Sequence, residues 1–371
     1  MLENLQNLGF GKTVQKRRTV MSQQIRAIAT HVRPHLDEIV AIWLLIKFGA
    51  DKYPGVAEAA IEYWTNGGNA PDGRSAEGYE AEGYLLVGTG GGRFDEHGRN
   101  GDKSKQGDCA ATLVAKDLGI DQDPILVKIL KFTLTNDLHG TSHPFDISAI
   151  SKAMHEFYPD DPEKVMTWAM AALDVKYLEQ KGFVDAQIAL ENAEVLTIMD
   201  GTQQHKMVII ESDSEHVSKA ARNKSGLDAA IVVQKRSTGN VQIFSNKRHG
   251  LQLYDLAQML RLEEQALADK VVTTDWAQLR AEGKIEGAEE WYFHHEGQML
   301  LNGSLSAPDV SPTRISLDQI KAAITIAVNP KCLPEHCASN AQCTYKKCPW
   351  YKMGLHRCRR IRYDMSQAQK S

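Results

Sequence analysis

Short apolar runs alternate with helix-like patterns along the first half of the chain. Residues 25–30 (IRAIAT) form a bounded apolar run that is typical of a buried strand. From Asp37 onward, apolar residues recur at helical spacing until Gly49. A second strand is predicted at 84–88, and helices at 108–118, 124–134 and 161–193. This order of strand, loop and helix predicts an α/β domain with a largely parallel sheet.

The alternation restarts in the second half. Strands are predicted at 195–199, 206–212 and 291–295, and a hairpin at 229–245 that turns at 238–240. Helices are predicted at 214–223, 253–267 and 316–324, the last of which begins after a capping serine, Ser316. We therefore place a domain boundary near residue 195 and expect a smaller α/β domain from there to about 330.

This pattern divides the 371 residues into four parts. They are an N-terminal extension (1–24), a first domain (25–195), a second domain (196–330) and a C-terminal tail (331–371). With 42 % hydrophobic and 24 % charged residues, the composition is typical of a globular protein with a sizeable core. No apolar run reaches the roughly 18 residues that cross a bilayer, and the N-terminal residues lack the apolar centre of a signal peptide. A cytoplasmic protein without a membrane partner is expected.

The tail differs from the rest of the chain in charge and in cysteine content. Its nine Lys or Arg against two Asp or Glu give a balance of +7, although the whole chain has a net charge of −4. It also holds five of the six cysteines: Cys332, Cys337, Cys343, Cys348 and Cys358. In a cytosolic chain such a cluster favours metal binding over disulfides. The sixth, Cys109, lies in an apolar helix and is expected in the core.

A short polar tail can bury little apolar surface, so a bound metal would supply the stability that its folding needs. Zn²⁺ held by four cysteines, or by three cysteines and His336 or His356, is the first expectation. An iron–sulfur cluster is the alternative, and free thiols are the third. Tyr345, Trp350 and Tyr351 alternate with Lys and Arg in the tail. This pattern is typical of single-stranded nucleic-acid binding, since bases stack and phosphates pair, although a basic tail could instead dock on the acidic body of its own protein.

Three short segments concentrate groups that can bind metals, and each lies where a predicted element ends. They contain His31, His35, Asp37 and Glu38; then Asp95, Glu96 and His97; then Asp137, His139 and His143. Imidazole combined with carboxylate suits Mn²⁺, Zn²⁺ or Fe²⁺. Each segment alone could be a helix cap or a solvated loop. Together they match a two-metal hydrolase, in which two cations about 3.5–4 Å apart activate water toward a phosphoester.

The segments THVRPHLDE, VGTGGGRFDEHG and NDLHGT resemble the DHH-type phosphoesterase superfamily, and are most similar to its melanocyte-proliferating-gene branch. That branch comprises metal-dependent phosphoesterases, including RNA exonucleases. The similarity extends over residues 25–330 and is strong only in these three motifs. It implies a DHH-like parallel-sheet catalytic domain followed by a smaller α/β substrate-binding domain.

Carried over motif by motif, the resemblance implies a set of metal ligands: His31, His35, Asp37, Glu96, His97 and Asp137. Asp95 matches the leading aspartate of the DHH triplet and is expected to support the histidines; Asp95 and His97 are the predicted catalytic pair. Two positions depart from the family pattern. Glu96 replaces the first histidine of the triplet, and Gly88 stands where the family has an aspartate that bridges both metals. The site would then hold one tightly bound metal, use Glu96 or Glu82 in place of the missing carboxylate, or be inactive.

The segment WYFHHEGQMLLNGS resembles a late motif of the same branch, in a domain that grips substrate phosphates. The resemblance and the basic SNKRHG segment yield the expected substrate-binding residues: Lys247, Arg248, His249, His294, His295 and Gly303. The alternative is a polar strand end and a solvated hairpin end without a role.

These observations predict a metal-dependent phosphoesterase, with Mn²⁺ or a similar divalent cation, that cleaves single-stranded nucleic acid as an exonuclease or oligonucleotidase. Water would be the nucleophile, so no side-chain nucleophile is required. One alternative substrate is a small nucleotide or cyclic dinucleotide. Another interpretation is a degenerate, non-catalytic nucleic-acid-binding protein, and the sequence leaves a homo-oligomer open.

Overall fold

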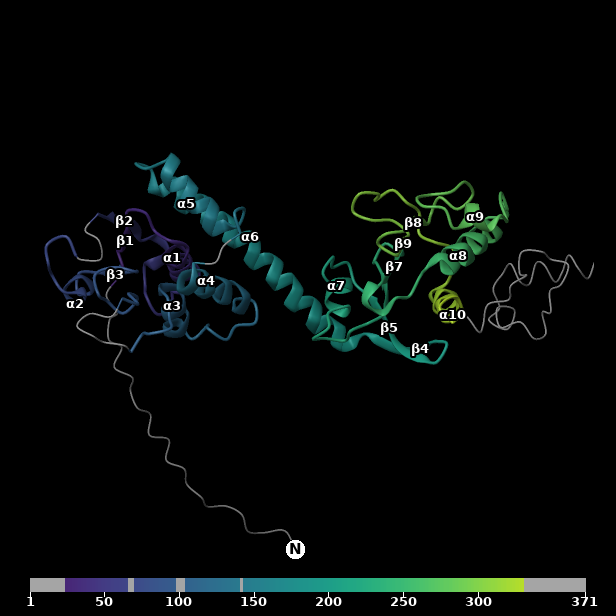
Figure 1. Ribbon diagram of the computed structural model, residues 1–371, viewed down its shortest axis with the longest axis horizontal. Coiled ribbons are helices and arrows are strands. Elements are labelled where there is room, and N and C mark those ends of the chain that lie inside the picture. The colour runs from purple at the N-terminus through teal and green to yellow at the C-terminus, as the bar shows by residue number, and fades with distance from the viewer. Residues whose placement is uncertain (1–23, 66–69, 98–103, 141–142, 330–371) are drawn as a thin grey trace, which may run out of the picture. The chain divides into compact units, whose positions relative to one another are not determined.

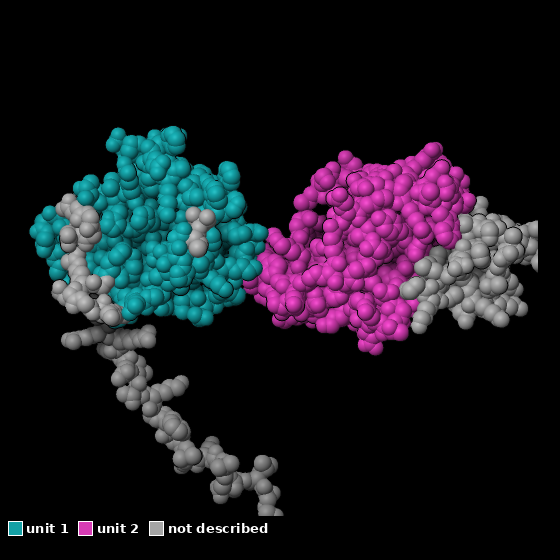
Figure 2. All heavy atoms as spheres, in the orientation of Figure 1, with its two compact units in different colours: residues 1–180 teal, residues 181–371 magenta. Residues whose placement is uncertain are grey.

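The computed structural model describes residues 24–65, 70–97, 104–140 and 143–329 (Figure 1). The chain divides into two compact units, Met1–Gln180 and Lys181–Ser371 (Figure 2). This division falls inside helix α6 (Pro162–Ala189), whereas the sequence places the boundary near residue 195. The predicted tail at 331–371, and the N-terminal extension apart from Gln24, lie outside the described residues.

A three-stranded parallel sheet forms the centre of the first unit. Its order is β2 (Ala60–Trp64), β1 (Ala27–His31) and β3 (Tyr84–Leu86), with Ala27 opposite both Ala60 and Tyr84. The predicted strands at 25–30 and 84–88 and the predicted parallel sheet are thus confirmed. The sequence did not predict β2, an edge strand that is only partly buried. Because all three strands are parallel, their carboxyl ends meet at one edge, where ligand sites of α/β folds gather.

Helices surround this sheet, and Figure 1 shows α1, α3 and α4 beside it. Their bounds are α1 Leu36–Phe48, α2 Ala76–Glu80, α3 Ala110–Leu118, α4 Val127–His139, α5 Ile147–Phe157 and α6, and a 3₁₀ turn lies at Val56–Glu58. Ten consecutive residues of α1 are buried, because the helix packs on the sheet and against α3 and α4. The indole Nε1 of Trp43 also donates to Asp174 of α6 at 3.0 Å. Helix α1 is therefore a fixed support for whatever its first turn carries.

Most helices of the first unit were predicted. Gly49 ends α1, and Gly119 ends α3 in the left-handed conformation at φ +71°. Helices α2 and α5 were not assigned from the sequence. Asp146 caps α5 by accepting the backbone N–H of Ala149 at 3.0 Å. Cys109 is fully buried at the start of α3, as expected of a core residue.

A six-stranded mixed sheet forms the second unit. Its order is β4-β5-β6-β7-β9-β8, with β4 Glu194–Asp200, β5 Gln203–Glu211, β6 Ile231–Lys235, β7 Val241–Ser245, β8 Tyr292–His294 and β9 Met299–Leu301. Only β5 and β6 pair in parallel, and β6 and β7 form the predicted hairpin. This unit too combines helices with a sheet, and its sheet has twice as many strands as that of the first unit.

Both faces of this sheet are covered. Helices α8 (Tyr254–Leu267) and α10 (Leu317–Ala327) pack on one face. The short α7 (Val217–Ala221) and residues 181–190 pack on the other. The remaining elements are α9 (Trp276–Leu279) and 3₁₀ turns at Leu190–Asn192 and Lys247–His249. The predicted cap of α10 is confirmed, since Ser316 Oγ accepts the backbone N–H of Gln319 at 3.3 Å.

A fully buried arginine ties an irregular segment of the second unit to α8. The guanidinium of Arg261 donates to the carbonyl oxygens of Leu279, Ala281 and Trp291 at 2.9, 2.8 and 3.1 Å, and also to that of Gly283. Burial lowers the pKa of Arg261 to about 10, so the guanidinium remains charged at neutral pH.

Among the helices in the described part of the chain, none has the length and apolar character needed to cross a membrane.

Candidate metal centre

The three predicted ligand segments meet at the carboxyl edge of the parallel sheet. The first lies after β1, the second after β3 and the third in the last turn of α4. All six predicted metal ligands line one cavity of about 420 Å³. Its lining consists of His31, His35, Asp37, Glu38, Glu96, His97, Asn136, Asp137, Gly140 and Lys152. The structure thus brings these residues together, while their role as ligands stays a prediction.

The first segment connects β1 to the fixed helix α1. His31 ends the strand and His35 precedes the helix, with the carbonyl oxygen of Pro34 held at 3.1 Å by Nε2 of the buried His155 in α5. Asp37 lies in the first turn of α1 and is only 3 % exposed. The carboxylate of Asp37 is thus carried by the first turn of a buried helix.

Asp95 organises the second segment. Its side chain is 4 % exposed and accepts the backbone N–H of Gly91 at 2.7 Å and that of His97 at 3.0 Å. Its Oδ1 also lies 3.3 Å from Nδ1 of His97. The ammonium of Lys105 holds the same loop by donating to the carbonyl oxygen of Asp95 at 2.8 Å. This geometry suits the supporting role predicted for Asp95, which does not line the cavity itself.

Helix α4 supplies the third segment. Asp137 lies in its last turn, and Gly140 ends the helix at φ +62°. The neighbouring Asn136 is buried and accepts a hydrogen bond from the hydroxyl of Ser148 in α5 at 2.8 Å. His139, the other candidate within this helix, is exposed and does not line the cavity.

Three ligand sets overlap within the site. In each set, one ligand atom of every residue lies within 4.8 Å of the others: His35, Asp37 and Glu38; Asp37, Glu96 and Asp137; Asp95, Glu96 and His97. Asp37 belongs to the first two sets, and Glu96 to the last two. A carboxylate shared by adjacent sets can bridge two cations, which is the arrangement of two-metal hydrolases.

The carboxyl groups of this cluster disfavour one another's ionisation. Burial, followed by the negative charge of Asp37, raises the pKa of Glu96 to about 7. Burial also raises the pKa of Asp37, with a further contribution from Asp137, and raises that of Asp137 itself. The pKa of Glu38 lies well above its ordinary value for the same reasons, burial and then Asp37. Perturbed groups in a cleft mark functional sites, because ionised carboxylates at this density need a cation.

The hydrogen-bond pattern gives an independent test of whether a cation fits. Oδ2 of Asp37 and Oε2 of Glu96 are buried without a hydrogen-bond partner in the described part of the chain. Buried polar atoms are rarely left unpartnered in proteins. A divalent cation would satisfy both oxygens, and carboxylate with imidazole is a donor set for Mn²⁺, Zn²⁺ or Fe²⁺. The residues present therefore fit a divalent metal.

Glu38 belongs to the cluster but was not among the predicted ligands. Its Oε1 lies 3.5 Å from Nε2 of His31, and its Oε2 accepts the backbone N–H of His35. Glu82, which the sequence had offered as a replacement carboxylate, pairs with Arg26 at 3.5 Å and Arg74 at 2.5 Å and does not line the cavity. The adjacent Asp37-Glu38 pair was a signal for Glu38, but in isolation a glutamate in a first helical turn is an ordinary cap.

Lys152 was also missed, because its helix α5 was not predicted. It is exposed and is the one lysine or arginine among the described residues that line the cavity. Its ammonium could pair with an anionic group next to the carboxylate cluster.

The six residues expected to bind substrate lie at two different ends of the sheet of the second unit. Lys247, Arg248 and His249 follow β7, where Arg248 pairs with Asp228 at 2.7 Å and Nδ1 of His249 lies 3.4 Å from Nδ1 of His205. The β8–β9 turn lies at the same end of the sheet, since Ser245 donates its backbone N–H to Gln298 at 3.0 Å.

In that turn, Nδ1 of His294 accepts the backbone N–H of Gly297 at 2.9 Å, and Nε2 of His295 lies 2.8 Å from the carbonyl oxygen of Arg280. Gly303 instead follows the other end of β9. It lines a pocket of about 190 Å³ with Arg236 and Asn240, among others. The substrate-binding role of all six residues stays a prediction.

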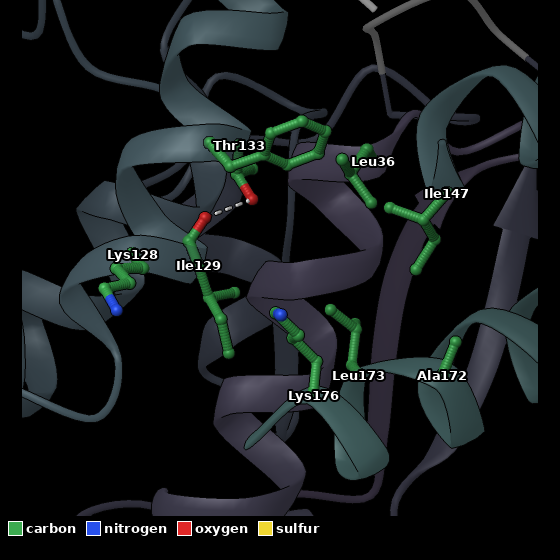
Figure 3. Close-up of a pocket in the computed structure, with 9 residues that line it drawn as sticks. Leu36, Lys128, Ile129, Thr133, Ile147, Ala172, Leu173 and Lys176 are labelled. Atoms are coloured by element: carbon green, nitrogen blue, oxygen red, sulfur yellow. Dashed lines mark hydrogen bonds between the residues drawn. The ribbon is translucent and has the colours of Figure 1, made fainter. Parts of the chain in front are cut away.

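A second cavity in the first unit has a different character. About 320 Å³ in size, it lies among α1, α4, α5 and α6 and is lined by Leu36, Lys128, Ile129, Phe132, Thr133, Ile147, Ala172, Leu173 and Lys176 (Figure 3). The hydroxyl of Thr133 donates to the carbonyl oxygen of Ile129 at 3.0 Å. With no carboxylate or imidazole in its lining, this cavity is no candidate for the predicted chemistry.

No family model matches the chain, and no curated protein matches it. A solved structure that is similar is a crystal structure of an uncharacterized protein from Helicobacter pylori G27. The two share 11 % identity over 64 % of this chain and 90 % of that chain, with a TM-score of 0.16. A likeness of this size carries no argument about fold or function.

Proposed function

We propose that this protein is a divalent-metal-dependent phosphoesterase of the DHH type that hydrolyses phosphodiester bonds, acting as an exonuclease or oligonucleotidase on single-stranded nucleic acid. The observation that supports it best is Asp37. This buried carboxylate belongs to two overlapping ligand sets, and one of its oxygens has no partner among the described residues. A cavity of about 420 Å³ opens beside it, large enough for a nucleotide but not for a duplex.

Divalent cations supply such a site with Lewis-acid chemistry, since they polarise a phosphoryl oxygen and neutralise the charge that develops on the leaving oxygen. The chain's own residues prepare the site for them. Asp95 faces Nδ1 of His97, which favours the tautomer with its proton on that nitrogen. The side chain of His97 is 77 % exposed, so its Nε2 lone pair remains accessible to a cation or to a proton.

Lys152 gives the same cavity an anion-binding group. In this proposal its ammonium pairs with a substrate phosphate while the carboxylates hold the cations. The cavity size also suits a small nucleotide or a cyclic dinucleotide, which is the second candidate substrate. A degenerate site that only binds nucleic acid is the non-catalytic alternative.

The tail is part of this proposal only through its sequence. Cys332, Cys337, Cys343, Cys348 and Cys358 lie outside the described residues. Zn²⁺ bound there, or an iron–sulfur cluster, stays a prediction, as does capture of single-stranded nucleic acid by the tail. Metal analysis and a visible absorption spectrum of the full chain would distinguish the two metals, because Zn²⁺ sites are colourless and iron–sulfur clusters are not.

The test is Mn²⁺-dependent hydrolysis of end-labelled single-stranded RNA and DNA, of oligonucleotides of two to five residues, and of a cyclic dinucleotide. We expect cleavage by the full chain and its loss in Asp37→Asn, which keeps the side-chain shape but removes the charge. Asp72→Asn is the matched control, because Asp72 is an exposed partner of Arg74. Cleavage of only the small substrates would favour the second candidate. Strand binding without cleavage of any substrate would contradict the enzyme proposal and support the binding protein.

A further inference from the structure

Glu38 fills the space above Gly88. Gly88 follows β3 with φ +62° and is held there by a 2.9 Å hydrogen bond from its N–H to the carbonyl oxygen of Phe94. A Cβ placed on Gly88 would lie 2.4 Å from Oε1 of Glu38, 2.6 Å from its Cγ and 2.9 Å from its Cδ. Real Cβ atoms do not approach other atoms so closely. A side chain on Gly88 and the observed position of Glu38 are therefore mutually exclusive.

Glu38 is held in this position from two sides. It lies in the first turn of the buried helix α1 and is itself buried. The backbone N–H of His35 donates to Oε2 of Glu38. The other carboxylate oxygen, Oε1, lies 3.5 Å from Nε2 of His31. One oxygen of Glu38 thus caps the N-terminus of α1, and the other faces the imidazole of His31 at the end of β1. A helix cap alone requires only the first of these contacts.

We propose that Glu38 supplies, from the start of α1, the carboxylate that Gly88 cannot supply from the end of β3, and that it binds a second cation together with His35 and Asp37. This inference rests on the proposed function, because it concerns the same metal centre. The first ligand set, which contains Glu38, shares Asp37 with the set formed by Glu96 and Asp137. The absence of a side chain at Gly88 then leaves the space into which the longer Glu38 side chain extends from the neighbouring helix.

Calorimetric titration of the full chain with Mn²⁺ tests this assignment. Mn²⁺ is a suitable probe because it prefers carboxylate and imidazole to thiolate, and Asp37→Asn measures any binding elsewhere in the chain. We expect two Mn²⁺ ions per wild-type chain above that background. Glu38→Gln should bind one Mn²⁺ ion fewer, or bind one of the two ions at least tenfold more weakly. Gly88→Ala should do the same, since its Cβ displaces Glu38.

Glu163→Gln is the matched control, since Glu163 lies in the first turn of α6 and is exposed. It should bind Mn²⁺ as the wild type does. Thermal unfolding of chelator-treated protein gives a second readout that does not depend on activity. Glu38→Gln removes a buried charge, so it should unfold at an equal or higher temperature than the wild type without metal, and gain less stability from Mn²⁺.

The outcomes separate the two proposals. Two ions bound with unchanged affinity in Glu38→Gln would overturn the assignment of Glu38 and leave the metal centre intact. One ion in both the wild type and Glu38→Gln would also overturn it, while the proposed phosphoesterase could still act with a single metal. A wild-type chain that binds no Mn²⁺ above the Asp37→Asn background would contradict both the assignment of Glu38 and the proposed metal-dependent phosphoesterase.

Discussion

His155 donates from Nε2 to the carbonyl oxygen of Pro34 over 3.1 Å, and this contact joins helix α5 to the loop between β1 and α1. The imidazole is buried, and burial lowers the pKa of His155. It is therefore neutral at physiological pH and can donate one hydrogen bond. His155 does not line the cavity, but the carbonyl that it binds lies in the loop that carries His31 and His35.

We expect His155→Ala to weaken Mn²⁺ binding by about ten- to a hundredfold, the usual effect of removing a group that orients metal ligands. His155→Gln can donate to the same carbonyl and should recover part of the affinity. Calorimetric titration of both variants checks this. Equal Mn²⁺ affinity in the wild type and His155→Ala would show that the loop is held without the hydrogen bond.

The metal-free protein should become less stable as the pH rises from about 5 to 7.5. The pKa of Glu96 is raised from 4.5 to about 7 by burial and by Asp37, so the folded state holds a proton in this range that the unfolded state has lost. Stability is then greatest below the unfolded pKa and falls as the pH passes the folded pKa. We expect a loss of about 1–3 kcal/mol between these values.

Urea denaturation with a chelator present, at several pH values, measures this loss. Glu96→Gln cannot ionise at this position and should lessen the dependence on pH, with the remainder due to the other raised carboxyl groups, Asp37, Glu38 and Asp137. Adding Mn²⁺ at pH 7.5 should stabilise the wild type more than this variant, because the variant lacks one ligand of the set formed with Asp37 and Asp137. A wild-type stability that rises over this pH range would contradict the prediction.

Lys152→Met should weaken substrate binding more than it slows turnover. The methionine keeps most of the length of the side chain and removes the one lysine or arginine charge in the described cavity lining. Because this charge would pair with substrate phosphate, we expect KM to rise about tenfold, consistent with the loss of one charge-assisted hydrogen bond. Lys131→Met, at an exposed position of α4, is the control. A fall in kcat with an unchanged KM would assign Lys152 to the chemical step instead.

Arg261→Met should destabilise the second unit by about 3 kcal/mol or more, since it leaves four carbonyl groups without their buried donor. Arg74→Met is the control. Arg74 is an exposed arginine that pairs with Asp72 and Glu82, and its loss should leave the free energy of unfolding close to that of the wild type. Urea denaturation compares the two variants. Similar stabilities would mean that water replaces the guanidinium in the segment that it holds.

The sequence determined the elements that carry their own local signal. The apolar run before His31, the helical spacing after Asp37, and the end of that helix at Gly49 each depend on neighbours within a few residues, and each prediction is confirmed. It also located the three candidate ligand segments, because the chain places imidazole and carboxylate groups where two strands and one helix end. By contrast, β2 and α5 have weaker patterns and are positioned by the elements on which they pack.

Only the tertiary structure decided which groups share a space. From the sequence, Gly88 is a missing carboxylate and Glu38 a helix cap, because no local rule relates residues fifty positions apart. Folding packs the first turn of α1 against the end of β3, and there the absent Cβ of Gly88 leaves the volume that Glu38 fills. The same folding separates Gly303 from Lys247, since they follow opposite ends of paired strands. Local propensity fixes elements, whereas packing between distant segments fixes the site.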